Sequence, residues 1–235
     1  MRRIRYVLGF LALLYCFQKA AAQNWYEQGL QYFMGNKPLE ASVSLEKAVR
    51  EAGADERAYL YLGISYIQLG RYDDALLTLQ KGSSKATVYP HLVYFNIGNV
   101  FFMQGKNEFA AEAYTSAIQA KPDYAPAYLN RANTRLKLND LINSVTDYTL
   151  YLSFDPDSPQ AETIRKLIDL LTAQITASQQ AAALLAAQKL AEAQAQAALQ
   201  AAIAQSLIDA AANTTNLSTG SGDFQGYEDP LQLED

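Results

Sequence analysis

The side chains that could do acid–base, nucleophilic or metal chemistry are few in this sequence, and they are scattered. His91 is the only histidine, and it follows Pro90 at an expected helix start, with no second ligand or nucleophile nearby. Asp73 and Asp74 are adjacent carboxylates just after Arg71, where the start of a helix favours acidic residues. The sequence contains no phosphate-binding glycine loop and no HExxH or GxSxG motif. We therefore expect no enzyme, no cofactor and no metal site.

The first 22 residues have the order of an export signal. A basic start ("MRRIR") is followed by an apolar run of 12 residues ("YVLGFLALLYCF") and a small-residue exit ("QKAAAQ"). This order predicts a secretory signal peptide cut between Ala22 and Gln23, and a periplasmic, extracellular or envelope-associated protein. A retained membrane anchor is less favoured, because a spanning helix needs about 20 residues. Lipid attachment at Cys16 is a third alternative, and the bulky Tyr15 argues against it.

Charge is distributed unevenly along the chain. The formal net charge is −5, and cleavage after Ala22 would make it more negative by removing four basic residues. Five acidic residues and no lysine or arginine lie in the last 13 residues. Nucleic acid is therefore not an expected partner.

Small residues recur along the chain with a period near 34. One set consists of Gly29, Gly63, Gly98 and Ala132, and a second follows twelve residues later at Ala41, Ala75, Ala110 and Ser144. Large residues follow four positions further on, at Leu45, Leu79, Tyr114 and Tyr148. A glycine inside a helix costs about 1 kcal/mol relative to alanine, so these positions indicate a close approach of two helices. At Gly63 we expect leucine to be disruptive and alanine to be tolerated.

This pattern resembles the tetratricopeptide repeat family over residues 23–156. The resemblance implies an all-α, right-handed solenoid of four antiparallel helix pairs. Beyond it we expect a capping helix over 157–172, starting at Ser158, and an Ala/Gln-rich helix over 173–212. The large apolar residues of the second helix keep no heptad, so a long coiled coil is poorly supported. Residues 213–235 have the composition of a disordered acidic tail, with glycosylation motifs at Asn213 and Asn216.

In the tetratricopeptide repeat family the first helices line a concave groove, where asparagines often grip a bound peptide. The residues that match are Asn96, Asn99, Asn130 and Asn133. Asn99 and Asn130 correspond to the asparagine pair of domains that capture a C-terminal carboxylate. The cations of such a clamp are replaced by Phe95, Gln160 and Ile164, so the sequence argues against carboxylate capture. The alternative is that these asparagines bridge neighbouring helices.

An apolar strip is expected along the same groove, with basic residues at its far end. The strip consists of Tyr26, Leu30, Phe33, Leu60, Ile64, Ile67, Phe95, Phe102 and Met103, and the basic residues are Arg131, Arg135 and Lys137. The combination suggests an amphipathic helix or extended peptide with an acidic end as the partner. We therefore expect an exported adaptor that binds a protein in its groove. The alternative is a structural envelope protein that self-associates through residues 173–212.

Overall fold

The computed structural model describes residues 23–51 and 54–218, and every regular element in that part is a helix. The export segment predicted over residues 1–22, with Cys16, lies outside the described residues, as do residues 219–235 of the predicted tail. The first described helix covers residues 23–34. It is followed by α2 (Pro38–Arg50), α3 (Glu56–Gln68), α4 (Tyr72–Ser83), α5 (Pro90–Met103), α6 (Asn107–Ala120), α7 (Ala125–Lys137), α8 (Leu141–Phe154) and α9 (Ala161–Ser218).

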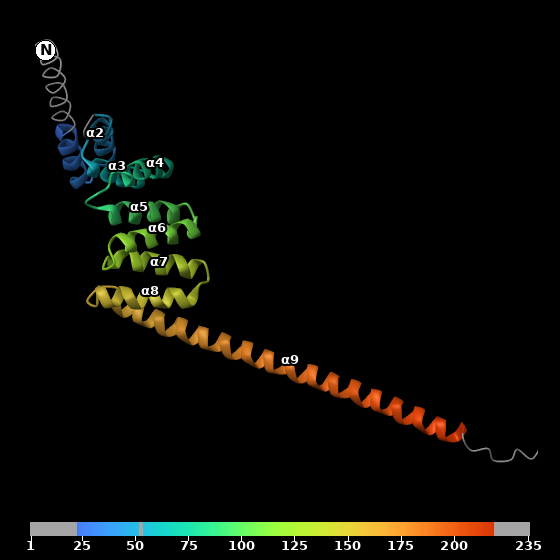
Figure 1. Cartoon of the computed structure of the whole chain (residues 1–235). Coiled ribbons are helices and arrows are strands. Elements are labelled where there is room, and N and C mark those ends of the chain that lie inside the picture. Colours follow the sequence, from blue (N-terminus) through green and yellow to red (C-terminus); the bar gives the residue numbers. More distant parts are fainter. Residues whose placement is uncertain (1–22, 52–53, 219–235) are drawn as a thin grey trace, which may run out of the picture. The chain divides into compact units, whose positions relative to one another are not determined.

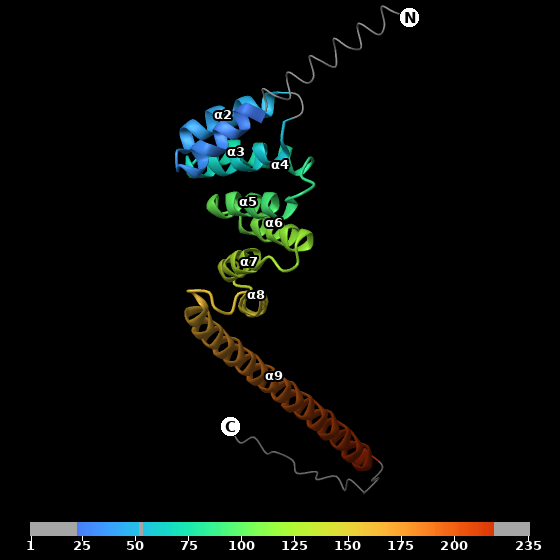
Figure 2. The same ribbon diagram turned by 90° about the vertical axis from the view of Figure 1, so that its left-hand side faces the viewer.

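Successive helices pack as pairs that are stacked one after another from α2 to α8 (Figures 1 and 2). The pairs are residues 23–34 with α2, α3 with α4, α5 with α6, and α7 with α8. One hydrophobic cluster joins the first three pairs, and a second joins the fourth pair to the first turns of α9. The predicted all-α solenoid of helix pairs is therefore confirmed.

The two helices of each pair are joined by the same turn. One residue per turn has a left-handed backbone, and these residues are Asn36, Gly70, Gly105 and Asn139, with φ between 53° and 73°. At Gly70 its N–H donates to Ile67 O at 3.0 Å and the next N–H donates to Tyr66 O at 2.8 Å. Equivalent bonds occur in the other three turns. This arrangement satisfies the last carbonyls of the first helix and fixes where the second begins.

The glycines with the 34-residue spacing lie directly against the large residues of the second helices. A Cβ placed on Gly63 would lie 2.5 Å from Leu79 Cγ, and one on Gly98 would lie 2.6 Å from a ring carbon of Tyr114. A Cβ on Gly29 would likewise lie 2.6 Å from Leu45 Cγ. The expected close approach is present. The expected tolerance of alanine at Gly63 stays a prediction, and the geometry argues against it because the methyl group alone meets a fully buried leucine.

Helix α9 differs from the expectation in its boundaries. It is a single helix that runs without a break through residue 172, where the predicted capping helix and the predicted Ala/Gln-rich helix meet. It starts at Ala161 and not at Ser158, whose hydroxyl group lies in the preceding turn and bonds to the Tyr151 hydroxyl. It also continues to Ser218, into the predicted tail. No glycine or proline occurs between Ala161 and Ser218, and adding residues to an existing helix costs little.

The chain divides into two compact units, the first ending at Ile175 and the second starting at Thr176. In the first unit, Ile164 and Leu171 of α9 are buried and pack in the cluster that contains Tyr148 and Tyr151. In the second unit, the large apolar side chains are more than half exposed at Leu184, Leu185, Leu190, Leu199, Ile203, Leu207 and Ile208. None of the helices in the described residues has the length and hydropathy needed to cross a membrane.

Candidate partner-binding face

A pocket of about 260 Å³ opens among the first helices of the second, third and fourth pairs. Its lining consists of Ile67 from α3, Asn99, Phe102 and Met103 from α5, Tyr114 from α6 and Asn130 from α7. We call it the first-helix pocket. Met103 is 58% exposed and Phe102 is half-buried, so apolar surface is available there. The volume is below the 300–1,000 Å³ typical of small-molecule sites and suits a single large side chain of a protein partner.

Asn99 and Asn130, which were predicted to grip a partner, are brought together by the structure. The Asn130 amide donates to Asn99 Oδ1 at 2.9 Å, and the Tyr114 hydroxyl donates to the same oxygen at 2.9 Å. Burial raises the pKa of Tyr114 above its ordinary value, which keeps this hydroxyl protonated as a donor. These contacts join α5, α6 and α7. They are the contacts of the bridging alternative, and gripping of a partner backbone stays a prediction.

Asn133 and Asn96 also have partners within the chain. The Tyr148 hydroxyl donates to Asn133 Oδ1 at 2.6 Å, which repeats in the fourth pair the bond between Tyr114 and Asn99. The Asn96 amide donates to the Leu92 carbonyl one turn earlier in α5. The asparagines therefore hold their helices in place, as buried or half-buried polar groups usually do.

The predicted apolar strip is only partly a surface. Tyr26 and Leu60 are 3% and 4% exposed, so their assignment to an open groove is wrong. They face the neighbouring helices because close packing of the pairs encloses that side of each first helix, and burial raises the pKa of Tyr26 to about 12. Five further members are half-buried against the core or its aromatic rings, namely Leu30, Phe33, Ile64, Ile67 and Phe95. The last two members, Phe102 and Met103, line the first-helix pocket.

The arginines predicted to meet an acidic partner instead surround a buried carboxylate. Asp147 of α8 is 0% exposed. The Arg131 guanidinium donates to both of its oxygens, at 2.9 and 2.7 Å, and Arg135 donates at 2.6 Å. Arg131 also donates to Thr115 of α6 at 2.9 Å. The assignment of both arginines to a free basic surface is therefore wrong, because an unpaired carboxylate at that depth would be costly. Lys137 remains exposed, with its ammonium 5.0 Å from the centre of the Phe102 ring.

Asp147 was not predicted from the sequence, although the sequence contains a signal for it. Ser144, Asp147, Tyr148 and Tyr151 have the i, i+3, i+4, i+7 spacing of one helix face, and all four are buried. A charged residue on such a face requires a partner on the helix opposite. That reasoning would have pointed to the arginines of α7.

His91 lies at the start of α5, as expected, but it is half-buried. Its ring packs edge-on against Tyr124 at 5.1 Å between centroids and lies near Tyr89. Burial, with a contribution from Lys121, lowers the pKa of His91. Within the part of the chain that the structure describes, no group of three acidic, histidine or cysteine side chains could hold a metal ion.

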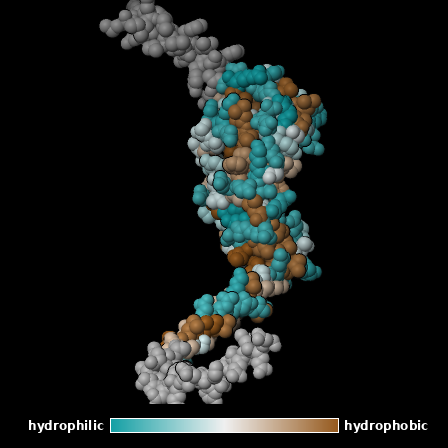
Figure 3. All heavy atoms as spheres, turned by 90° about the vertical axis from the view of Figure 1, so that its right-hand side faces the viewer, coloured by the Kyte–Doolittle hydropathy of each residue, from teal (hydrophilic) through white to brown (hydrophobic). Residues whose placement is uncertain are grey.

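On the face in Figure 3, apolar surface forms separate islands among hydrophilic residues. A partner on that face would have to contact discrete apolar sites and not one long strip.

The fold and these sites define a solenoid of stacked helix pairs. A model of the TPR repeat family matches residues 93–139, which run from within α5 to the turn after α7. Residues 93–139 therefore match the tetratricopeptide repeat that the glycine and alanine spacing predicted.

Known proteins with related sequence or fold are consistent with this conclusion. Mouse RNA polymerase II-associated protein 3 is 30% identical over 148 residues, which are 60% of this chain and 22% of that protein. The chain thus covers about a fifth of the length of the curated relatives it matches. The crystal structure of MamA is 24% identical with a TM-score of 0.55, covering 57% of this chain and 78% of MamA. YrrB, described as a TPR protein with an unusual peptide-binding site, is 19% identical with a TM-score of 0.55, covering 70% and 88%.

Proposed function

We propose that this chain is an exported adaptor that binds a protein or peptide at the first-helix pocket. The observation that carries the proposal is the pocket itself, in which the second and third pairs contribute the half-buried Ile67 and Phe102 and the exposed Met103. The bridge from Asn99 to Asn130 of the fourth pair lies beside them. A large apolar side chain of a partner could enter this space and be desolvated there. Lys137, next to the Phe102 ring, would favour an acidic residue beside that anchor. The peptide-binding site named for YrrB and the repeats themselves support a role in protein interaction.

The experiment is site-specific photo-crosslinking in the cell that expresses the full chain. A photoreactive residue replaces Met103 in one variant and Phe109 in the other. Phe109 is 55% exposed on α6 but does not line the pocket. We expect position 103 to capture one defined protein, and we expect Ile67→Glu to abolish that capture. Equal capture from both positions, or capture that Ile67→Glu leaves unchanged, would contradict the proposal.

Export is part of the proposal and has its own test. It is supported by the order of basic, apolar and small residues in positions 1–22. The mass of the protein purified from its native compartment should correspond to a chain starting at Gln23. A chain that keeps its first residue or carries lipid on Cys16 would overturn this part without affecting the pocket.

A second candidate function is self-association through α9, in a structural envelope protein. It is favoured by the exposed leucines and isoleucines of residues 176–212, a segment with only three charged residues. Sedimentation of the full chain and of a chain ending at Ile175 separates the two functions. A dimer or larger assembly that is lost on truncation supports the structural role, whereas a monomer in both cases rejects it.

A further inference from the structure

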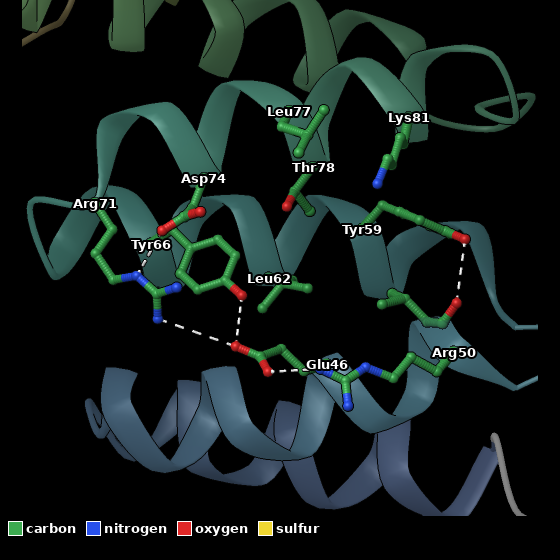
Figure 4. Close-up of a pocket in the computed structure, with 11 residues that line it drawn as sticks. Glu46, Arg50, Tyr59, Leu62, Tyr66, Arg71, Asp74, Leu77, Thr78 and Lys81 are labelled. Carbon is green, nitrogen blue, oxygen red and sulfur yellow. Dashed lines mark hydrogen bonds and ion pairs between the residues drawn. The ribbon is translucent and has the colours of Figure 1, made fainter.

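A second and larger pocket, of about 460 Å³, lies between α2 and α4 and is closed on its inner side by α3 (Figure 4). We call it the inter-repeat pocket. Leu62 of α3 lies at its inner side and is buried, and Val49 and Leu77 add apolar surface from α2 and α4. The polar side chains around it are Glu46, Arg50, Tyr59, Tyr66, Arg71, Asp74, Thr78 and Lys81.

The fourth pair shows why space remains here. Positions 69 residues further along the chain are equivalent, so Leu62 corresponds to Arg131 and Thr78 corresponds to Asp147. In the fourth pair the Arg131 guanidinium bonds to Asp147 on one side and to Thr115 of the preceding pair on the other. Leu62 is shorter than arginine and has no polar side-chain atom, so it makes no equivalent bonds. The second pair therefore has a cavity where the fourth has a filled ion-pair network.

The charges of the inter-repeat pocket do not cancel. Its two carboxylates have donors, because Glu46 accepts from the Tyr66 hydroxyl at 2.6 Å and Asp74 accepts from Arg71 at 2.8 Å. Among the described residues the Lys81 ammonium has no hydrogen-bond or ion-pair partner. Figure 4 shows Thr78 extending from α4 towards Leu62 and Lys81 extending towards Tyr59. Arg50, across the pocket on α2, is 75% exposed and has a single long contact of 3.4 Å with Glu46.

We propose that the inter-repeat pocket binds a partner peptide in which an aspartate or glutamate lies beside a leucine, isoleucine or methionine. The carboxylate would pair with Lys81 and accept from the Thr78 hydroxyl, and the apolar side chain would cover the exposed Leu77 and the half-buried Val49. The site is complementary to such a peptide because the unpaired Lys81 ammonium lies next to apolar surface. A polyanion such as nucleic acid is disfavoured, because Glu46 and Asp74 lie within the same pocket.

The test uses a displayed library of random 12-residue peptides, selected on the full chain. The selected peptides are then measured against Lys81→Glu, Lys106→Glu and Met103→Glu. Lys106 is an exposed lysine at the start of α6 and serves as the charge-matched control. We expect a class of acidic–apolar peptides whose affinity falls about tenfold or more with Lys81→Glu and is unchanged by the other two variants.

The possible results separate this site from the first-helix pocket. Peptides that lose affinity only with Met103→Glu belong to the first-helix pocket and support the proposed function alone. If no selected peptide depends on Lys81, or if those that do are basic, the proposal for the inter-repeat pocket is overturned. Circular dichroism of Lys81→Glu shows whether the variant is folded, and raised salt should weaken the binding of the Lys81-dependent class.

Discussion

The second and fourth helix pairs have the same backbone arrangement, but different side chains occupy equivalent positions between their helices. Both turn at a residue with left-handed backbone, Gly70 in one and Asn139 in the other. In the second pair, Leu62 and Thr78 border a cavity of about 460 Å³, whereas Arg131 and Asp147 occupy the equivalent positions in the fourth. The difference shows that the repeat specifies where helices turn and cross, while the chemistry between them varies from pair to pair. Variants at equivalent positions can therefore test the comparison directly.

The largest effect is expected at the buried carboxylate. Asp147→Ala should lower the free energy of unfolding by about 3 kcal/mol, because it leaves Arg131 and Arg135 without their shared partner. The equivalent change in the second pair, Thr78→Ala, should change it by less than ~0.5 kcal/mol. Urea denaturation of both variants measures the difference. Similar losses at the two sites would show that the ion-pair network adds nothing to the fourth pair.

The asparagine–tyrosine bonds should give the next effect. Asn99→Ala is expected to cost about 2 kcal/mol, because both the Tyr114 hydroxyl and the Asn130 amide lose an acceptor. At the equivalent position of the fourth pair, Asn133→Ala removes one such bond and should cost about 1 kcal/mol. Thermal melting of the two variants shows which substitution costs more stability. A larger loss at Asn133 would mean that the bridge between α5 and α7 is not what makes Asn99 important.

The close approach in the second pair should make an added methyl group unfavourable. Gly63→Ala is expected to cost about 1–2 kcal/mol, since overpacking against Leu79 exceeds the gain in helix propensity. In the fourth pair alanine is native, so Ala132→Gly should also destabilise, by about 1 kcal/mol. Chemical denaturation distinguishes the outcomes, and a Gly63→Ala protein more stable than the parent would refute the close-packing argument.

The smallest expected effect concerns pH at the junction of the third and fourth pairs, where His91 packs on Tyr124. The pKa of His91 is lowered in the folded chain by burial, so folding favours the neutral ring. Its contribution is present above the unfolded pKa of about 6.5 and is lost as pH falls through the lower folded value. The melting temperature of the parent should fall more between pH 7.5 and 5 than that of His91→Gln. Parallel curves would exclude this contribution.

The sequence predicted where the helices cross, but it did not predict the partners of the charged side chains or which apolar residues are buried. The spacing of Gly29, Gly63 and Gly98 predicted the helix crossings, because only a residue without a side chain fits against a large neighbour. The partner of a charge depends on which helix lies opposite, and spacing alone does not give that, so Arg131 was assigned to a free surface. The same uncertainty placed buried Leu60 in the groove.

The central claim is that the first-helix pocket binds a partner through exposed apolar side chains and not through residues that hold the fold. Met103→Glu tests it directly, because Met103 lines the pocket and is 58% exposed. A photoreactive residue replaces Phe102 in two proteins, one with Met103 and one with Met103→Glu. The amount of crosslinked partner recovered and the unfolding free energy are measured for both. We predict that recovery is lost while stability changes by less than ~0.5 kcal/mol. Undiminished recovery would contradict the account.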